Sequence, residues 1–209
     1  AASFALLAYA SCWLKRHHPD AFLAALLNSQ PLGFYAPAQL IADARRHVVQ
    51  VRAVDVNVSA VQSTLEGDAA LRAVRFGLDR IHGLAQAAME HIVAARAAGE
   101  FTDVEDLAQR AQLNRATLDV LAASGALNAL SGHRRQARWQ ALGTEVQRPA
   151  LLQPARFTEP EHALPAAPEG ENIVADYARL GFTLGRHPLA LLRPRLTRLR
   201  MQCAQDLAH

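Results

Sequence analysis

The sequence predicts a mainly α-helical protein with one small β-hairpin or sheet. The chain of 209 residues is rich in alanine, the best helix former, and only 6% of its residues are aromatic. Apolar residues recur at helical spacing in short segments that proline and glycine separate. Residues of high β propensity gather in one stretch, near residues 49–76. Together these three observations favour short helices interrupted once by strands.

The first expected helix spans residues 3–15 and is alanine-rich and apolar. Its candidates for burial are Phe4, Leu7, Cys12 and Leu14. The chain begins without methionine or a basic region, so it does not read as a signal peptide. It reads like a helix entered partway, and we expect an internal segment of a longer protein.

Two further helices are expected to open at proline. Pro19 suits the first turn of a helix that runs to about Asn28, and Pro37 suits the first turn of another. Residues 29–35 between them form a turn-rich connector. The third helix ends in the basic residues 45–47, whose charge complements the helix dipole. That position gives these basic residues a structural explanation.

Residues 49–76 are expected to form a small antiparallel sheet. Val49, Val51 and Val54 are β-branched. Residues 62–65 and 71–76 flank Glu66-Gly67-Asp68, which resembles a hairpin turn.

Residues 77–147 return to short helices with tight turns. Thr102 is expected to cap one helix while Glu105 reaches back to it. Asn114 suits the cap of another helix that ends near Ala123, and residues 133–147 predict one more.

Residues 148–170 carry five prolines and are expected to form a linker or an extended surface segment. Residues 171–180 then predict a helix, and Pro188 opens another. The end of the chain is rich in arginine.

The charge of the chain favours a polyanionic partner only weakly. The formal net charge is +3 and the sequence pI is about 9.3, with most of the positive charge on arginine. Arginine suits phosphate recognition because its planar fork donates two parallel hydrogen bonds. A GC-rich genome also explains an excess of arginine and alanine, so both explanations stay open.

Cysteine usage and hydropathy exclude several classes of protein. The two cysteines, Cys12 and Cys203, are too few for a disulfide framework or a zinc site, and they fit a reducing cytoplasm. No uncharged stretch of about 18 apolar residues predicts a transmembrane helix. We therefore expect a cytoplasmic protein without a membrane partner.

The most informative local motif is Ile81-His82-Gly83-Leu84-Ala85, which approximates a helix-hairpin-helix. A glycine allows the tight turn, and the helix that follows points free N–H groups at a DNA phosphate. The candidate DNA contacts here are Gly83, Leu84, Ala85 and Gln86. Ala85 replaces the usual second glycine and Met89 the usual small residue, so a helix–turn–helix connection without a DNA role is an equal alternative.

A second, weaker copy of the motif follows. It consists of Leu118, Leu121 and the turn Ser124-Gly125-Ala126-Leu127. Arg134 and Arg135 lie shortly after it. Gly125, Arg134 and Arg135 are therefore further candidate DNA contacts.

The sequence contains no self-contained catalytic or metal site. Polymerase-type chemistry needs carboxylates that converge on two metal ions. Asp103, Glu105 and Asp106 are clustered, but in a first helical turn such acids favour the helix dipole. No zinc-ligand spacing, Walker loop or Gly-x-Ser-x-Gly motif occurs. We expect no catalytic residue, metal or cofactor in this chain.

Longer strings of residues along nearly the whole chain carry a family resemblance. They are residues 1–15, 19–27, 28–40, 43–47, 54–57, 124–127, 132–137, 173–177 and 184–189. In this order they resemble the alpha-subunit family of bacterial DNA polymerase III, within the C family of polymerases, and in particular its error-prone branch.

The resemblance implies fingers-end helices followed by a tandem helix-hairpin-helix domain. Residues 1–70 would be the C-terminal part of the fingers and residues 71–147 the tandem domain. Residues 148–170 would be the Pro-rich linker, and residues 171–209 would lead to a following OB-fold. The catalytic aspartates of the family lie upstream, so no residue here inherits them.

By resemblance, the parent is an error-prone DNA-directed DNA polymerase that uses Mg²⁺ in translesion synthesis, DNA repair and damage-induced mutagenesis. Its expected partners are duplex or primer-template DNA and other translesion-synthesis proteins. The segment at Gln153-Pro154-Ala155-Arg156-Phe157 departs from the clamp-binding pattern of replicative members, so direct sliding-clamp binding is not expected. The alternatives are a stand-alone helix-hairpin-helix or repair-scaffold module, a protein-binding module, and a fragment of the replicative alpha subunit.

Overall fold

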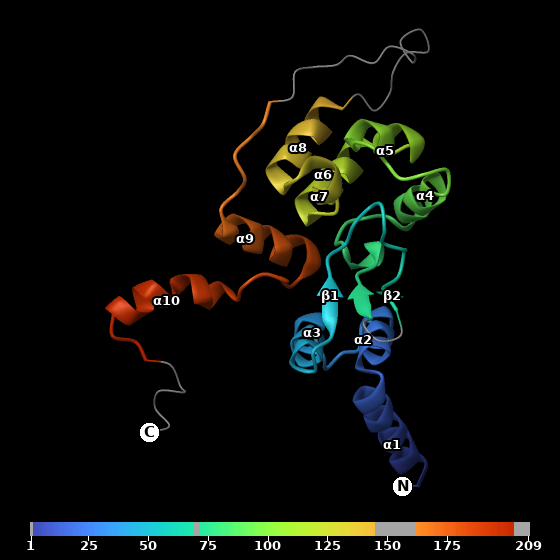
Figure 1. The fold of residues 1–209 in the computed structure, drawn as a ribbon, viewed down its shortest axis with the longest axis vertical. Helices are drawn as coiled ribbons and strands as arrows, with labels where there is room; N and C mark the ends of the chain where they lie inside the picture. Colours follow the sequence, from blue (N-terminus) through green and yellow to red (C-terminus); the bar gives the residue numbers. More distant parts are fainter. Residues whose placement is uncertain (1, 69–71, 145–161, 203–209) are drawn as a thin grey trace.

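The computed structural model describes residues 2–68, 72–144 and 162–202. The molecule is elongated, with α1 at one end and a cluster of short helices toward the other (Figure 1). Most of its described residues outside loops are helical, and one small sheet lies between the N-terminal helices and the cluster (Figure 1). The predicted fold class, mainly α with a small sheet, is confirmed.

Three helices form the N-terminal part, and the prolines begin two of them as predicted. They are α1 (Ala2–His17), α2 (Pro19–Asn28) and α3 (Pro37–Arg46). The burial predicted within α1 is wrong, since Phe4 is 78% exposed and Leu7, Cys12 and Leu14 are exposed too. The physical reason is that α1 extends away from the rest of the molecule and meets α2 only near its own end (Figure 1).

The sheet has three strands in the order β1-β3-β2. Strands β2 (Thr64–Glu66) and β3 (Ala73–Arg75) are antiparallel, as the hairpin prediction requires. Strand β1 (Gln50–Arg52) pairs with β3 in parallel, so the prediction of a purely antiparallel sheet is wrong. A hairpin connection sets the direction of β2 against β3 only. The direction of β1 depends on the path of the chain between β1 and β2.

The helical cluster follows the sheet. It begins with a single turn of 3-10 helix, η1 (Leu78–Arg80). The helices after it are α4 (Gln86–Arg96), α5 (Val104–Arg110), α6 (Arg115–Ser124), α7 (Asn128–Ser131) and α8 (Arg134–Gly143). Helix α6 packs closely on α8, and the leucines of its inner face, Leu118 and Leu121, are fully buried. These apolar contacts hold the short helices together, because isolated helices of this length are marginal in water.

The cap of α5 lies one residue after the predicted one. Asp103, not Thr102, is the N-cap residue, and its carboxylate accepts a hydrogen bond from the N–H of Asp106 at 2.8 Å. The side chain of Asp106, not that of Glu105, reaches back, to the N–H of Thr102. Aspartate is at least as good an N-cap as threonine, so two adjacent candidates compete and the helix register decides between them.

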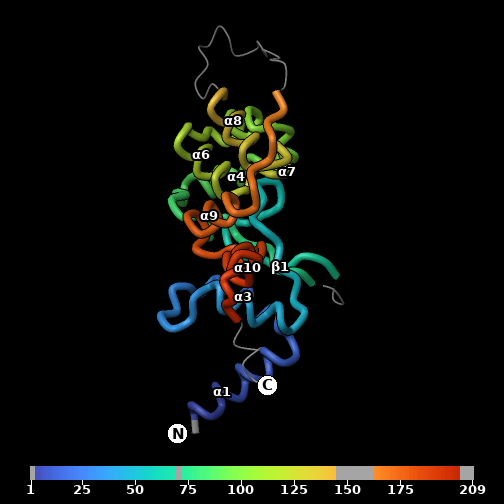
Figure 2. Tube along the Cα trace, turned by 90° about the vertical axis from the view of Figure 1, so that its left-hand side faces the viewer, coloured from blue at the N-terminus to red at the C-terminus, as the bar shows by residue number. Residues whose placement is uncertain are grey.

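The C-terminal part contains α9 (Glu169–Leu180) and α10 (Pro188–Arg198). Figure 2 shows α9 beside the helical cluster, and in Figure 1 α10 projects to the left of the molecule from α9, which it contacts. Helix α9 packs on α6, and Phe182 after it meets Phe76 edge-on, with ring centroids 5.1 Å apart. Most of the predicted Pro-rich linker, and the pentapeptide at residues 153–157, lie outside the described residues. Helix α9 begins at residue 169, within the range predicted for that linker.

The described residues include no helix that is long and apolar enough to cross a bilayer.

Candidate nucleic-acid interface

The hairpin before α4 exposes its backbone while its apolar side chains anchor it. Ile81, Leu84 and Met89 are buried in the core, whereas Gly83 and Ala85 between them are exposed. Short hydrogen-bonded turns shape it: the N–H of Ile81 donates to the carbonyl of Leu78 at 3.1 Å, and the N–H of Leu84 to the carbonyl of Ile81 at 3.3 Å. The turn therefore presents main chain to solvent on a rigid base.

Gly83 is in the left-handed conformation, with φ of 87°. A Cβ atom there would meet nothing closer than 3.8 Å, so there is room for a side chain. The requirement for glycine is therefore conformational, since other L residues are strained at positive φ.

The N-terminus of α4 has no capping side chain. Its N-cap residue is Ala85, whose methyl group accepts no hydrogen bond, and no acidic residue lies in its first turn. In contrast, the side chains of Asp103, Asn114 and His133 cap α5, α6 and α8. Gln86 and Ala87 of the first turn are exposed. This helix end therefore keeps both free N–H groups and the positive end of the helix dipole available to an anion.

Arg179, at the end of α9, lies beside this hairpin. Its carbonyl accepts the N–H of His82 at 2.7 Å. One guanidinium nitrogen lies 3.8 Å from the position that a Cβ would take on Gly83, and the other lies 3.8 Å from a carboxylate oxygen of Asp119. The interface therefore includes a cation that the sequence did not identify. No local pattern could have found it, because Arg179 is about a hundred residues away from the motif.

The structure does not bring the other predicted contacts together with the first hairpin. Gly125 has φ of 85° and ends α6, but it is buried, and the guanidinium of Arg134 lies 3.1 Å from where its Cβ would be. Arg134 forms an ion pair with Asp176 and donates to the carbonyls of Ser124 at 3.0 Å and Asn172 at 2.8 Å. Its guanidinium thus joins α6 and α8 to α9.

Arg135 is more open than Arg134. Its guanidinium donates to Glu171 at 2.9 Å and to the carbonyl of Pro165 at 3.2 Å, and more than a third of the side chain is exposed. It therefore has a partner within the chain but remains accessible to a ligand.

A second helix–turn–helix unit lies one element before the predicted second copy. Helices α5 and α6 are joined by a turn in which Gln112 has φ of 52°, and Gln112, Asn114 and Arg115 are exposed. Unlike Ala85, Asn114 caps its helix with its own side chain, which accepts the N–H of Thr117 at 2.9 Å. The predicted Asn114 cap was the signal that could have located this turn.

Arg96, at the end of α4, has a structural role. One of its guanidinium nitrogens donates to the carbonyls of Val56 at 2.9 Å and Ser59 at 3.0 Å. Burial lowers its pKa from the ordinary value, and the nearby Asp55 opposes that effect. These bonds tie α4 to the loop after β1.

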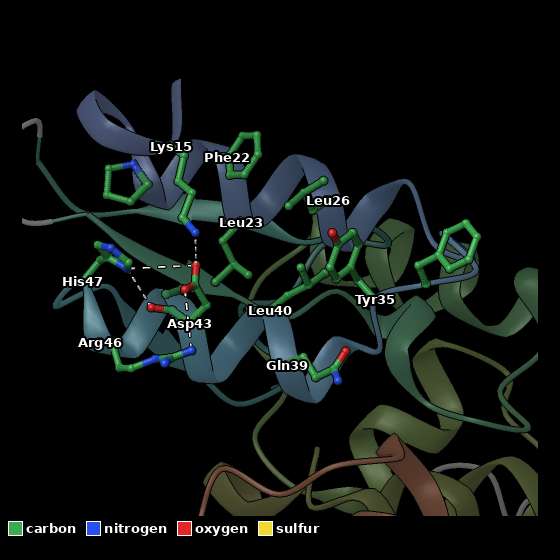
Figure 3. A pocket seen from close by; sticks show the side chains of 13 residues that line it. Lys15, Phe22, Leu23, Leu26, Tyr35, Gln39, Leu40, Asp43, Arg46 and His47 are labelled. Carbon is green, nitrogen blue, oxygen red and sulfur yellow. Dashed lines mark hydrogen bonds and ion pairs between the residues drawn. The ribbon is translucent and has the colours of Figure 1, made fainter. Parts of the chain in front are cut away.

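A separate groove of about 640 Å³ lies between α1, α2 and α3 (Figure 3). Of the described residues that line it, Asp43 is the one carboxylate, and Lys15 reaches across from α1 to bind it at 2.7 Å. The hydrogen bond from Lys15 lowers the pKa of Asp43, and the charges of His47 and Arg46 add to this. The groove offers a bound carboxylate between apolar walls, not a pair of carboxylates for acid–base or metal chemistry.

Among the described residues, no group of three histidine, cysteine, aspartate or glutamate side chains is arranged to hold a metal ion. The acids clustered at the start of α5 have roles in the helix: Asp103 caps it, and Asp106 in its first turn binds Arg110 at 2.9 Å.

Comparisons with known proteins agree with this geometry. The family described as a helix-hairpin-helix motif matches residues 48–137, a range that includes both the turn before α4 and the turn before α6. The chain is 59% identical to an error-prone DNA polymerase of Azoarcus sp. strain BH72 over 214 residues, which is 100% of this chain. It is 53% identical to that of Alkalilimnicola ehrlichii over 210 residues, 100% of the chain, and 55% identical to that of Bordetella parapertussis over 210 residues, 99% of the chain. The chain spans 20% of the length of each of these relatives.

Proposed function

We propose that this chain, which over its whole length is similar to one segment of the bacterial error-prone DNA polymerases, is a DNA-handling segment of such a polymerase. It grips the backbone of duplex or primer-template DNA without reading the base sequence. The observation that carries the proposal is the uncapped first turn of α4, exposed behind a glycine in the left-handed conformation.

The contact set of this grip starts from the first hairpin. Main-chain N–H groups at Gly83, Ala85 and Gln86 meet a phosphate, and Arg179 adds a charge-assisted bond from the side. Leu84 supports the turn from the core instead of touching DNA. Phosphate contacts carry no base information, so the grip is independent of sequence.

Fewer residues than the sequence predicted remain as proposed DNA contacts around the second turn. Gly125 is buried and Arg134 is bonded within the chain, so we assign both to the framework of the helical cluster. Arg135 and the exposed Arg115 remain the proposed contacts of this half of the surface.

For the whole polymerase, we propose nucleotidyl transfer from a deoxynucleoside triphosphate to a primer 3′ end during translesion synthesis, together with other translesion-synthesis proteins in the cytoplasm. Such chemistry needs carboxylates that converge on Mg²⁺. By the resemblance to the polymerase family, we assign these carboxylates and their ions to residues upstream of this segment.

We keep the division of the chain as a proposal that rests on the resemblance. Residues 1–70 end the fingers, residues 71–147 form the tandem helix-hairpin-helix domain, residues 148–170 link it onward, and residues 171–209 lead to an OB-fold. In this division Arg179 comes from outside the domain whose hairpin it flanks.

Salt-dependent binding of fluorescent duplexes tests the proposal. Duplexes of unrelated sequence should bind with equal affinity, and log affinity should fall linearly with log salt concentration. Arg179→Ala should reduce the steepness of that line by about 0.9, because one phosphate contact is lost. The exposed Arg16, on α1 at the far end of the molecule, is the matched control, and Arg16→Ala should leave the slope unchanged. A strong preference for one duplex sequence, or equal slopes for wild type and Arg179→Ala, would contradict the proposed grip.

A further inference from the structure

A second groove, of about 480 Å³, lies between α8 and α9. Its apolar walls include Trp139 and Leu142 of α8 and Val174 of α9, all of them largely exposed. Trp139 is 56% exposed, which is unusual for a side chain that normally contributes its large apolar surface to a core. The groove therefore presents an aromatic surface that nothing in the described part of the chain covers fully.

The same groove is lined by cations. Arg134, Arg135 and Arg138 of α8 contribute to it, against the one carboxylate of Glu171 among its described lining residues. An arginine that flanks an aromatic ring can contact the phosphates on either side of a base that stacks on that ring.

Arg134 itself belongs to the framework of this groove. Its terminal guanidinium nitrogens are bonded to Ser124, Asn172 and Asp176, and its Nε atom is buried against Gly125. Arg135 and Arg138, whose side chains are 37% and 58% exposed, are the cations that a ligand in the groove can reach.

The groove adjoins the hairpin that we assign to duplex DNA. Arg179 touches the hairpin at Gly83 and lies 3.8 Å from Asp119, and Asp119 accepts a hydrogen bond from Arg138 at 3.2 Å. Arg138 is the neighbour of Trp139 in α8. A line of side chains therefore leads from the proposed duplex grip to Arg138, which lines the groove together with the exposed indole of Trp139.

From these observations we propose that the α8–α9 groove binds single-stranded DNA, with one unpaired base stacked on Trp139 and adjacent phosphates held by Arg135 and Arg138. The proposal rests on the proposed function, since it takes the strand from the duplex at the first hairpin. An apolar peptide would also fit Trp139 and Leu142, but it would bring no negative charge to the accessible guanidinium groups of Arg135 and Arg138. These two cations favour the nucleic acid.

Tryptophan fluorescence tests the proposal directly, because the chain contains only two tryptophans, Trp13 and Trp139. Trp13 lies on α1, away from the groove, where its ring is 4.6 Å from that of His17. In the full chain with Trp13→Phe, all tryptophan emission comes from Trp139. Titration with a 12-nucleotide oligothymidine should quench this emission, because a stacked base contacts the indole directly.

Variants then connect the signal to affinity. Trp139→Leu in the native background should weaken oligothymidine binding about tenfold in fluorescence anisotropy, within the range of base–aromatic stacking. Trp13→Phe should bind like the wild type. Thermal unfolding by circular dichroism should show that both variants remain folded, since both tryptophans are well exposed.

The outcomes separate this proposal from the duplex grip. Ala85→Asp, which fills the end of α4, should weaken duplex binding and still allow oligothymidine to quench Trp139. If saturating oligothymidine leaves Trp139 emission unchanged while duplex binding still depends on Arg179, the groove is not a nucleic-acid site and an apolar protein segment is the better occupant. If neither DNA form binds, the proposed function itself fails.

Discussion

Replacing Ala85 with aspartate should change the stability of α4 and its binding of a phosphate in opposite directions. Ala85 has φ of −72° and ψ of 145°, the extended conformation of an N-cap residue, and its side chain is exposed. An aspartate there can accept the free N–H groups of the first turn, as Asp103 does at α5. The variant should therefore fold more stably and bind DNA less well.

The two magnitudes follow from the same hydrogen bonds. Alanine at an N-cap costs about 0.5–2 kcal/mol relative to aspartate, so Ala85→Asp should raise the free energy of unfolding by about 1 kcal/mol. In a chain of this size this corresponds to a rise in Tm of about 2–4 °C. A hydrogen bond to a charged group contributes about 1.5–3 kcal/mol, so the loss of the phosphate contact should weaken duplex binding by tenfold or more.

Circular dichroism melting and anisotropy with duplex DNA measure the two effects. Ala85→Ser is the matched control, because serine also caps the helix but brings no negative charge toward the phosphate. Its stability should rise similarly, and its affinity should fall less. Should Ala85→Asp bind duplex with the affinity and salt slope of the wild type, the end of α4 does not contact a phosphate. Should it melt below the wild type, the first turn already has a cap.

Three further perturbations probe the framework of the interface. Arg134→Ala should lower the free energy of unfolding by about 3 kcal/mol in urea titrations, because Asp176 in a largely buried site loses its cationic partner and keeps only the hydrogen bond from Thr183. The salt slope of duplex binding should stay unchanged. A changed slope with intact stability would make Arg134 a DNA contact. The hydrogen bond from Arg75 lowers the pKa of Glu66 in the folded protein. The pair therefore stabilises the fold at pH values above the pKa of Glu66 in the unfolded chain, near 4.5. This stabilisation is lost as the pH falls through the lower pKa of Glu66 in the folded protein. The stability of Glu66→Gln should therefore depend less on pH than that of the wild type as the pH falls below about 4.5, and an unchanged acid-unfolding curve would contradict this. Gly77→Ala should lower the free energy of unfolding by several kcal/mol, because the new Cβ atom would lie 2.4 Å from the backbone of Gln62. If the variant is as stable as the wild type, this backbone moves freely to make room.

Features that depend on a few neighbouring residues were predictable from the sequence. Pro19, Pro37 and Pro188 each begin a helix because proline needs no N–H partner in a first turn. Gly83 has the positive φ that its place in the hairpin requires. The exposed turn before α4 therefore followed from the motif itself.

Two kinds of prediction failed: a choice between two neighbouring helix caps of similar energy, and the burial of apolar side chains on a helix whose packing partner the sequence does not show. Asp103 and Thr102 are both good caps, and the register of α5 selected Asp103. Phe4 is apolar and helical, but burial also needs a neighbouring element, and α1 has one only near its end.

The sequence by itself determined the helical composition, the hairpin before α4 and the kinship with error-prone polymerases, since each rests on local chemistry or on matched strings of residues. Only the tertiary structure decided which arginines are available. It packs Arg134 between α6, α8 and α9 and brings Arg179 next to Gly83, and neither placement is encoded in a local pattern. The physical reason is that an arginine is recruited by whichever acceptors the packed helices bring to it, and Asp176 and Asn172 reach Arg134 from about forty residues further along the chain.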